Sequence, residues 1–123
     1  MKMLVYSDLH NEFAPFELPP TDADLIILAG DIDTKARGVA WANEVFSQPV
    51  IYCAGNHEFY RGHIDHTLRK MREAALPHVR VLENQVWVCN QKRFLVTTGW
   101  TDFSCTGDAV AAMVTCAMWM NDF

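Results

Sequence analysis

The sequence predicts an α/β fold in which a parallel βαβαβ core is followed by short antiparallel strands. The core is predicted by short, nearly continuous apolar runs, each closed by a polar residue or a glycine, with helix-period segments between them. The second part is predicted by a change after Pro77 to short β-rich runs separated by polar turns. The chain has 123 residues, 50% of them hydrophobic, so we expect a single domain over residues 1–123.

Three apolar runs are the expected parallel strands, at residues 3–6, 25–29 and 50–54. Residues 11–24 contain three prolines and no sustained periodicity, which predicts a loop. Connections between parallel strands are expected to be right-handed crossovers.

Two helices are expected to pack on these strands. The first covers about residues 35–47, with Asp33 or Thr34 as its N-cap. The second covers residues 61–75 and is expected to place one apolar stripe against the core, at Ile64, Leu68, Met71 and Ala75.

The C-terminal third is expected to be less regular. Residues 79–82, 86–89 and 94–98 are expected to form antiparallel strands joined by turns. Residues 109–120 contain no charged side chain but are too few to span a bilayer, which predicts a buried or partner-facing helix.

Polar side chains follow each of the three expected parallel strands. Asp8 and His10 follow the first, Asp31 the second, and Asn56 with His57 the third. Because the carboxyl ends of parallel strands meet at one edge of a sheet, we expect these groups to converge there. Carboxylate, imidazole and amide oxygen suit Mn²⁺, Fe or Zn²⁺, and a pair of such ions can bind both the attacking and the leaving oxygen of a phosphoryl displacement.

Three motifs carry a family resemblance: DLH at 8–10, GDID at 30–33 and GNHE at 55–58. In this order and at these intervals they resemble the first three motifs of calcineurin-like metallophosphoesterases. WTDF at 100–103 and MNDF at 120–123 are similar to single-domain bacterial phosphohydrolases of that superfamily. The resemblance implies a four-layer α-β-β-α sandwich, of which this chain forms the N-terminal part, and hydrolysis of phosphomonoesters or phosphodiesters at two divalent metal ions.

The resemblance also implies a role for individual residues. Asp8 and His10 would hold the first ion, Asp31 would bridge the two, and Asn56 would bind the second. His57 would face the scissile phosphate and stabilise its developing charge or protonate the leaving oxygen. Glu58, which follows, is expected to anchor the turn by accepting hydrogen bonds.

Two departures from the family pattern lower the expected activity. Position 34 is threonine where larger members carry an acid that orients the histidine, so a dyad of His57 with the nearby Asp33 is not expected. The later histidine motifs are absent, since no histidine follows His78. We therefore expect a truncated phosphoesterase with a second ion site weaker than the first, activity weakened or lost, and an exposed sheet edge that favours self-association.

Other interpretations stay open for these residues. Asp8 and Asp31 could shape turns, His10 could be a hydrogen-bonded loop histidine, and Asn56 could occupy a left-handed position after Gly55.

Alternatives also apply outside the motifs, where Asp33 is expected to be a helix cap rather than a catalytic acid. His63 and His66 could bind a metal or lie on a solvated helix face, and Trp100 and Asp102 could line the substrate mouth or be a core tryptophan and a turn aspartate. The alternative function is a non-catalytic scaffold of the same fold that binds a protein partner.

Composition excludes several other classes. A net charge of −5 and a pI near 5.4 argue against bulk binding of nucleic acid or anionic membranes. The four cysteines have neither zinc-site nor disulfide-scaffold spacing, and the N-terminus lacks a signal peptide. We therefore expect a cytoplasmic protein whose partner is a phosphate-ester substrate.

Overall fold

A computed structural model describes residues 1–120 of the chain. Its centre is a four-stranded parallel sheet in the order β1-β2-β3-β4, formed by β1 (Met3–Tyr6), β2 (Leu25–Ala29), β3 (Val50–Cys53) and β4 (Val79–Val81). Tyr6 lies opposite Leu28, and Leu28 lies opposite Tyr52. The first three strands therefore end level with one another, so that the loops after them share one edge of the sheet.

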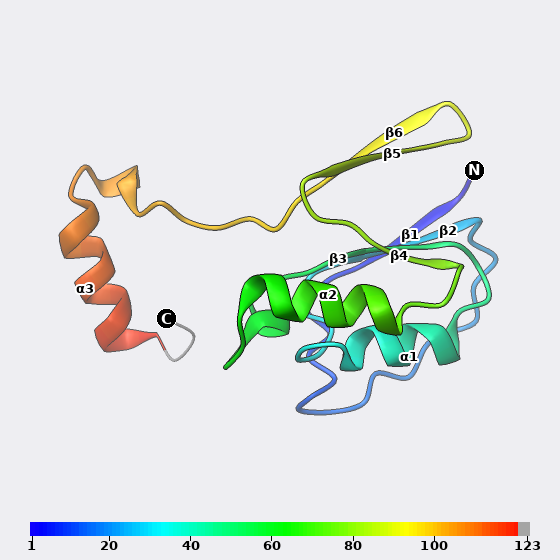
Figure 1. The fold of residues 1–123 in the computed structure, drawn as a ribbon, viewed down its shortest axis with the longest axis horizontal. Coiled ribbons are helices and arrows are strands. Elements are labelled where there is room, and N and C mark those ends of the chain that lie inside the picture. The colour runs from blue at the N-terminus through cyan, green and yellow to red at the C-terminus, as the bar shows by residue number, and fades with distance from the viewer. Residues whose placement is uncertain (121–123) are drawn as a thin grey trace.

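The sheet is covered differently on its two sides (Figure 1). Helices α1 (Arg37–Val45) and α2 (Ile64–Ala74) lie on one side, and the hairpin of β5 (Gln85–Cys89) and β6 (Lys92–Val96) lies on the other. The hydrophobic core forms where the helices meet the sheet, and its fully buried members include Ile26, Leu28, Val39, Tyr52 and Met71. Two short 3-10 turns are also present, η1 (His57–Phe59) and η2 (Ser104–Thr106).

Helix α1 approaches the sheet closely because it carries a glycine. A Cβ atom at Gly38 would lie 2.1 Å from the hydroxyl of Tyr52, so no larger residue fits without displacing that ring. Close approach matters here because protein interiors are packed without gaps.

The predicted parallel strands and the loop at 11–24 are confirmed. The antiparallel assignment of residues 79–82 is wrong, because β4 pairs in parallel with β3, Val79 opposite Val50. Helix α2 is the physical reason: a helix between two strands returns the chain to the same end of the sheet, and the next strand then runs in the same direction. The hairpin formed by β5 and β6 is antiparallel as predicted.

The predicted N-cap of the first helix is wrong. Helix α1 starts at Arg37, and its N-cap residue Ala36 provides no capping side chain. Asp33 is instead 5% exposed, and its Oδ1 accepts a 2.6 Å hydrogen bond from the backbone N–H of Thr34 and lies 3.4 Å from Nε of Arg37.

The second helix starts later than predicted. Residues 59–62 form a tight turn, with the N–H of Gly62 bonded to the carbonyl of Phe59, and α2 begins at Ile64. Of the predicted stripe, Leu68 and Met71 are buried, whereas Ile64 is 47% exposed because it lies at the very start of the helix.

Helix α3 (Ala109–Trp119) has the predicted extent, but the prediction that it is buried is wrong. None of its residues is buried, and Figure 1 shows it beside η2 and away from the sheet. That it faces a partner stays a prediction. Within residues 1–120 no helix is long and apolar enough to cross a membrane.

Strand β1 forms one edge of the sheet and exposes apolar side chains. Met3 is 46% exposed and Val5 is 57% exposed. The predicted self-association through a sheet edge stays a prediction, as does the single domain over residues 1–123.

The burial of α2 generates a stability prediction. Replacing Met71, which is fully buried, by alanine is expected to lower the free energy of unfolding by about 2–5 kcal/mol, because it leaves a cavity against the sheet. Replacing Ile64, which lies largely in solvent, by alanine is the control and is expected to cost less than about 1 kcal/mol. Urea unfolding followed by circular dichroism measures both, and equal losses would contradict the observed packing of α2.

Candidate metal centre

The loops after β1 and β2 continue side by side beyond the strands. The N–H of Asp8 donates to the carbonyl of Gly30 at 3.0 Å, and the N–H of His10 donates to the carbonyl of Asp31 at 3.0 Å. A third bond joins Asn11 N–H to the carbonyl of Ile32 at 2.9 Å. The loops are thus held by backbone bonds and not only by side chains.

These loops bring three of the predicted ligands together. Each of Asp8, His10 and Asp31 offers a ligand atom, and the three atoms lie within 4.8 Å of one another. Their backbones are left-handed, with φ of 54°, 48° and 55°. Such φ values cost roughly 1–3 kcal/mol per residue and persist only where surrounding contacts impose them, which the backbone bonds do here.

Asp31 is placed by the loop after β3. Its Oδ1 accepts a 3.0 Å hydrogen bond from the backbone N–H of His57, which supports the turn-forming interpretation of this aspartate, whereas its role as a metal ligand stays a prediction. A Cβ atom at Gly55 would lie 2.2 Å from Asp31 Oδ1 and 2.7 Å from its backbone nitrogen. Only glycine therefore lets the two loops meet at this separation.

Glu58 joins the same two loops from beneath. Its carboxylate is fully buried and accepts hydrogen bonds from the N–H groups of Asp31 at 3.1 Å, Ile32 at 3.0 Å and Gly55 at 2.8 Å. The hydroxyl of Tyr52 donates a fourth bond at 2.8 Å. Burial, followed by the charge of Glu58, raises the pKa of Tyr52 well above its ordinary value, so this hydroxyl keeps its proton. The structure bears out the expectation that Glu58 anchors the turn.

His57 has an acidic neighbour that the sequence did not reveal. Glu12 Oε1 lies 2.7 Å from Nδ1 of His57 and 3.2 Å from Nδ1 of His10, and the two imidazole rings are 4.4 Å apart. Glu12 follows Asp8 by four residues in a loop of no predicted structure, and no periodicity links it to a histidine 45 positions later. The sequence signal that could have pointed to Glu12 was its place among the polar residues that follow β1.

The electrostatics of Glu12 favour its ionised form. Burial alone would raise the pKa of Glu12, but hydrogen bonds from its own backbone and from His10 and His57 together outweigh that effect and hold the pKa below its ordinary value. Its side chain is 10% exposed, and Oε2 is buried with no hydrogen-bond partner among residues 1–120.

The donor set fits a divalent transition metal ion. Two carboxylates and an imidazole meet at Asp8, His10 and Asp31. A second group, of one carboxylate and two imidazoles, consists of His10, Glu12 and His57 and shares His10 with the first. The unpaired Glu12 oxygen is what a nearby cation would satisfy, since an isolated buried carboxylate oxygen is otherwise unfavourable.

Asn56 lies beside a different hollow. Its φ of −73° is right-handed, which excludes the left-handed interpretation, and it lines a cavity of about 530 Å³. Trp100 and Phe103 line the same cavity, and the Trp100 ring packs 5.7 Å from that of Phe59. Trp100 is 56% exposed and is therefore no core tryptophan.

The remaining candidates lie elsewhere or serve as structure. Asp102 bonds to the N–H and hydroxyl of Ser104 at 2.9 and 2.7 Å, which lowers its pKa and makes it a turn aspartate. His63 and His66 are exposed on α2 and join no metal-binding group among the described residues. The MNDF stretch lies outside the described residues apart from Met120.

Cysteine chemistry is not a competing explanation for the site. Cys53 ends β3 next to these loops, but burial, with smaller contributions from Glu83 and Glu58, raises the pKa of its thiol to about 11. A thiol with this pKa is protonated at neutral pH and is a poor nucleophile.

A family model for the calcineurin-like phosphoesterase superfamily domain matches residues 1–118, and the chain belongs to this superfamily. The predicted α/β class, with its parallel core and antiparallel hairpin, agrees with that membership. No curated protein matches the sequence.

The contact between Gly55 and Asp31 generates a prediction about metal affinity. Changing Gly55 to alanine is expected to displace the Asp31 carboxylate and weaken Mn²⁺ binding by at least about tenfold, as misplacing a ligand's supporting contacts does. Gly99→Ala is the matched control, because nothing lies within 4 Å of its added carbon. Titration of Mn²⁺ followed by electron paramagnetic resonance measures the affinity, and equal affinity in both variants would contradict the geometry.

Proposed function

We propose that this protein hydrolyses phosphate esters, with weakened turnover, at a dinuclear centre of divalent metal ions. Membership of the calcineurin-like superfamily indicates metal-dependent phosphoester hydrolysis. The observation that carries the proposal is the meeting of Asp8, His10 and Asp31 within 4.8 Å at the ends of two different strands. In this proposal Asp8 and His10 would hold the first ion, Asp31 would be a ligand of both ions, and Asn56 would contribute to the second, weaker one.

The chemistry divides between the ions and the chain. When bound, such ions coordinate phosphate oxygens and lower the pKa of a coordinated water. The imidazole of His57 is the proposed proton donor to the leaving oxygen, because its ring lies 4.4 Å from that of the proposed metal ligand His10. Its backbone N–H bonds to Asp31, so the catalytic imidazole and the bridging ligand are placed by one contact.

Glu12 is proposed to position His57. An ionised carboxylate only accepts hydrogen bonds, so the 2.7 Å contact requires the proton to be on Nδ1 of His57. This holds the ring in one orientation and one tautomer. Glu12 thus takes the place of the acid that the family pattern puts at position 34, where this chain has threonine.

The cavity beside Asn56 is the proposed substrate site. Its volume of about 530 Å³ is in the range of small-molecule pockets, and its walls include Trp100 and Phe103. Aromatic walls favour an ester with an apolar or planar leaving group. Manganese as the natural ion, and the cytoplasm as the location, are proposed from the residue types and the composition alone.

Hydrolysis of p-nitrophenyl phosphate and bis-p-nitrophenyl phosphate with Mn²⁺ tests the proposal. Asp31→Asn is expected to abolish Mn²⁺-dependent turnover together with tight Mn²⁺ binding, because it removes the bridging carboxylate. His57→Ala is expected to lower kcat by about 10²–10⁴ while Mn²⁺ still binds, because it removes only the proton donor.

Matched controls remove the same groups outside the site. Asp65→Asn and His63→Ala change exposed residues near the start of α2 and are expected to leave turnover unchanged. If the unaltered chain is inert with Mn²⁺ bound, or if Asp31→Asn retains turnover, the catalytic proposal is wrong and the non-catalytic scaffold becomes the better explanation.

The positioning role of Glu12 has its own measurement. Glu12→Gln is expected to lower kcat by about 10-fold with KM nearly unchanged, since substrate contacts stay intact while the imidazole loses its partner. In a His57→Ala background the same change is expected to have no further effect on kcat. Glu17→Gln, an exposed acid of the same loop, is the control. Additive losses in the double variant would contradict the role.

A further inference from the structure

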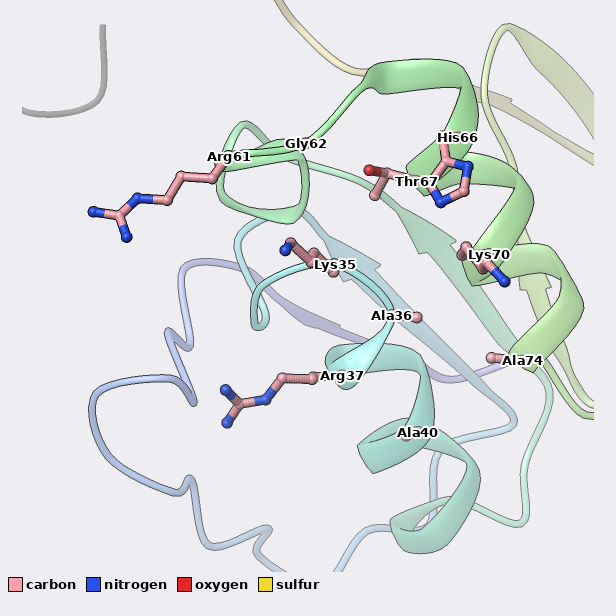
Figure 2. A pocket seen from close by; sticks show the side chains of 10 residues that line it. All are labelled: Lys35, Ala36, Arg37, Ala40, Arg61, Gly62, His66, Thr67, Lys70 and Ala74. Carbon is pink, nitrogen blue, oxygen red and sulfur yellow. The ribbon is translucent and has the colours of Figure 1, made fainter.

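A second cavity, separate in its lining from the metal centre, lies between α1 and α2 (Figure 2). Its volume is about 590 Å³. Five of its lining side chains are basic or can become so, and none is acidic: Lys35, Arg37, Arg61, His66 and Lys70. None of these residues is assigned a role at the metal centre.

The positive charge here is local. The chain as a whole carries a net charge of −5, yet four of its ten lysines and arginines line this one cavity. Arg37 lies 3.4 Å from Asp33 and Lys70 lies 3.7 Å from Glu73, but neither of those acids lines the cavity. Lys35 and Arg61 form no ion pair with any residue from 1 to 120. A cavity whose lining has several cations, two of them without an acidic partner, and no acid favours an anionic ligand.

The fold, and not local backbone preference, places the two cations that lack an acidic partner, of which Arg61 lies 5.6 Å from the ring centroid of Tyr60. Lys35 has a φ of 56° and Arg61 a φ of 51°, both in the left-handed region that long side chains rarely adopt. The N–H of Lys35 is held by the carbonyl of Glu58 at 3.0 Å, so it is tied to the turn that carries the metal-site loops. Figure 2 shows Arg37 and Arg61 extending to the same side, with Lys35 between them.

The start of α1 adds to the positive potential of the basic side chains. No side chain caps this nine-residue helix and its first turn has no acidic residue. Lys35, Ala36 and Arg37 line the cavity, so the first turn of the helix borders it, with the N–H of Arg37 bonded to the carbonyl of Thr34. Backbone N–H groups at a helix N-terminus, together with the helix dipole, favour bound phosphate.

The rest of the lining leaves room for more than one phosphoryl group. Ala36, Ala40 and Ala74 contribute small apolar side chains, and Thr67 contributes a hydroxyl that Figure 2 shows directed toward the Arg61–Gly62 turn. The volume is in the range of small-molecule pockets. We propose that this cavity binds a small molecule carrying adjacent phosphoryl groups. An extended nucleic acid fits less well, because the chain as a whole carries a net charge of −5.

Isothermal titration of the full chain with tripolyphosphate and with ADP, in EDTA so that no metal ion bridges the anion, tests this proposal. Both are expected to bind with one-to-one stoichiometry and to weaken as salt is raised. The paired variant Lys35→Gln with Arg61→Gln is expected to bind at least about tenfold more weakly, since two charged donors are lost. Tighter binding of ADP would identify a nucleotide as the ligand source, and tighter binding of tripolyphosphate an inorganic chain.

Two controls and one fallback variant make the test decisive. Lys92→Gln with Arg93→Gln removes the same charge from the exposed β6 strand, and Asp31→Asn alters the metal centre; both are expected to bind like the unaltered chain. Lys70→Gln, a single change on α2, is expected to give a smaller loss and replaces the double variant if that one fails to fold.

Four results would overturn the proposal. These are no binding at millimolar anion, equal losses in the two double variants, loss of binding in Asp31→Asn, or tighter binding of single-stranded RNA that depends on Lys92 and Arg93.

Discussion

The structure of the site depends on one buried carboxylate. Glu58 is fully buried and receives hydrogen bonds from three backbone N–H groups, at Asp31, Ile32 and Gly55, and from the hydroxyl of Tyr52. A buried charge is tolerated only when it is saturated with such donors, and saturation in turn fixes every donor in place. The loops after β2 and β3 are therefore held at a fixed distance from each other, and this distance sets the position of the proposed ligand Asp31.

The cost of this arrangement is visible in the backbone. Asp8, His10 and Asp31 all adopt left-handed φ values, and Asp31 fits against the next loop only because position 55 is glycine. Local preference opposes these conformations, so they exist because the sheet edge and the Glu58 hydrogen bonds impose them. Rigid placement of ligands before a metal ion arrives is what a binding site requires, since less ordering remains to be done on binding.

The same turns serve the proposed anion pocket. Lys35 lies four residues after Asp31, Arg61 four residues after His57, and the carbonyl of Glu58 holds the N–H of Lys35. A displacement of the turn at Glu58 would therefore move residues of both the metal centre and the proposed anion pocket.

The sequence by itself determined the parallel core and the residues that meet at its edge, because period and residue type decide burial, and the ends of parallel strands must share an edge. It also indicated that Glu58 anchors a turn. It did not reveal the direction of β4, the late start of α2 or the exposure of α3, since a short apolar run looks the same in either strand direction and a helix pattern does not say what covers it.

Only the tertiary structure decided that Glu12 meets His57, that Asp33 caps no helix, and that scattered cations surround one cavity. Each depends on the path of irregular loops, where no periodicity links residues far apart in the chain and where distance is set by the hydrogen bonds of the folded backbone.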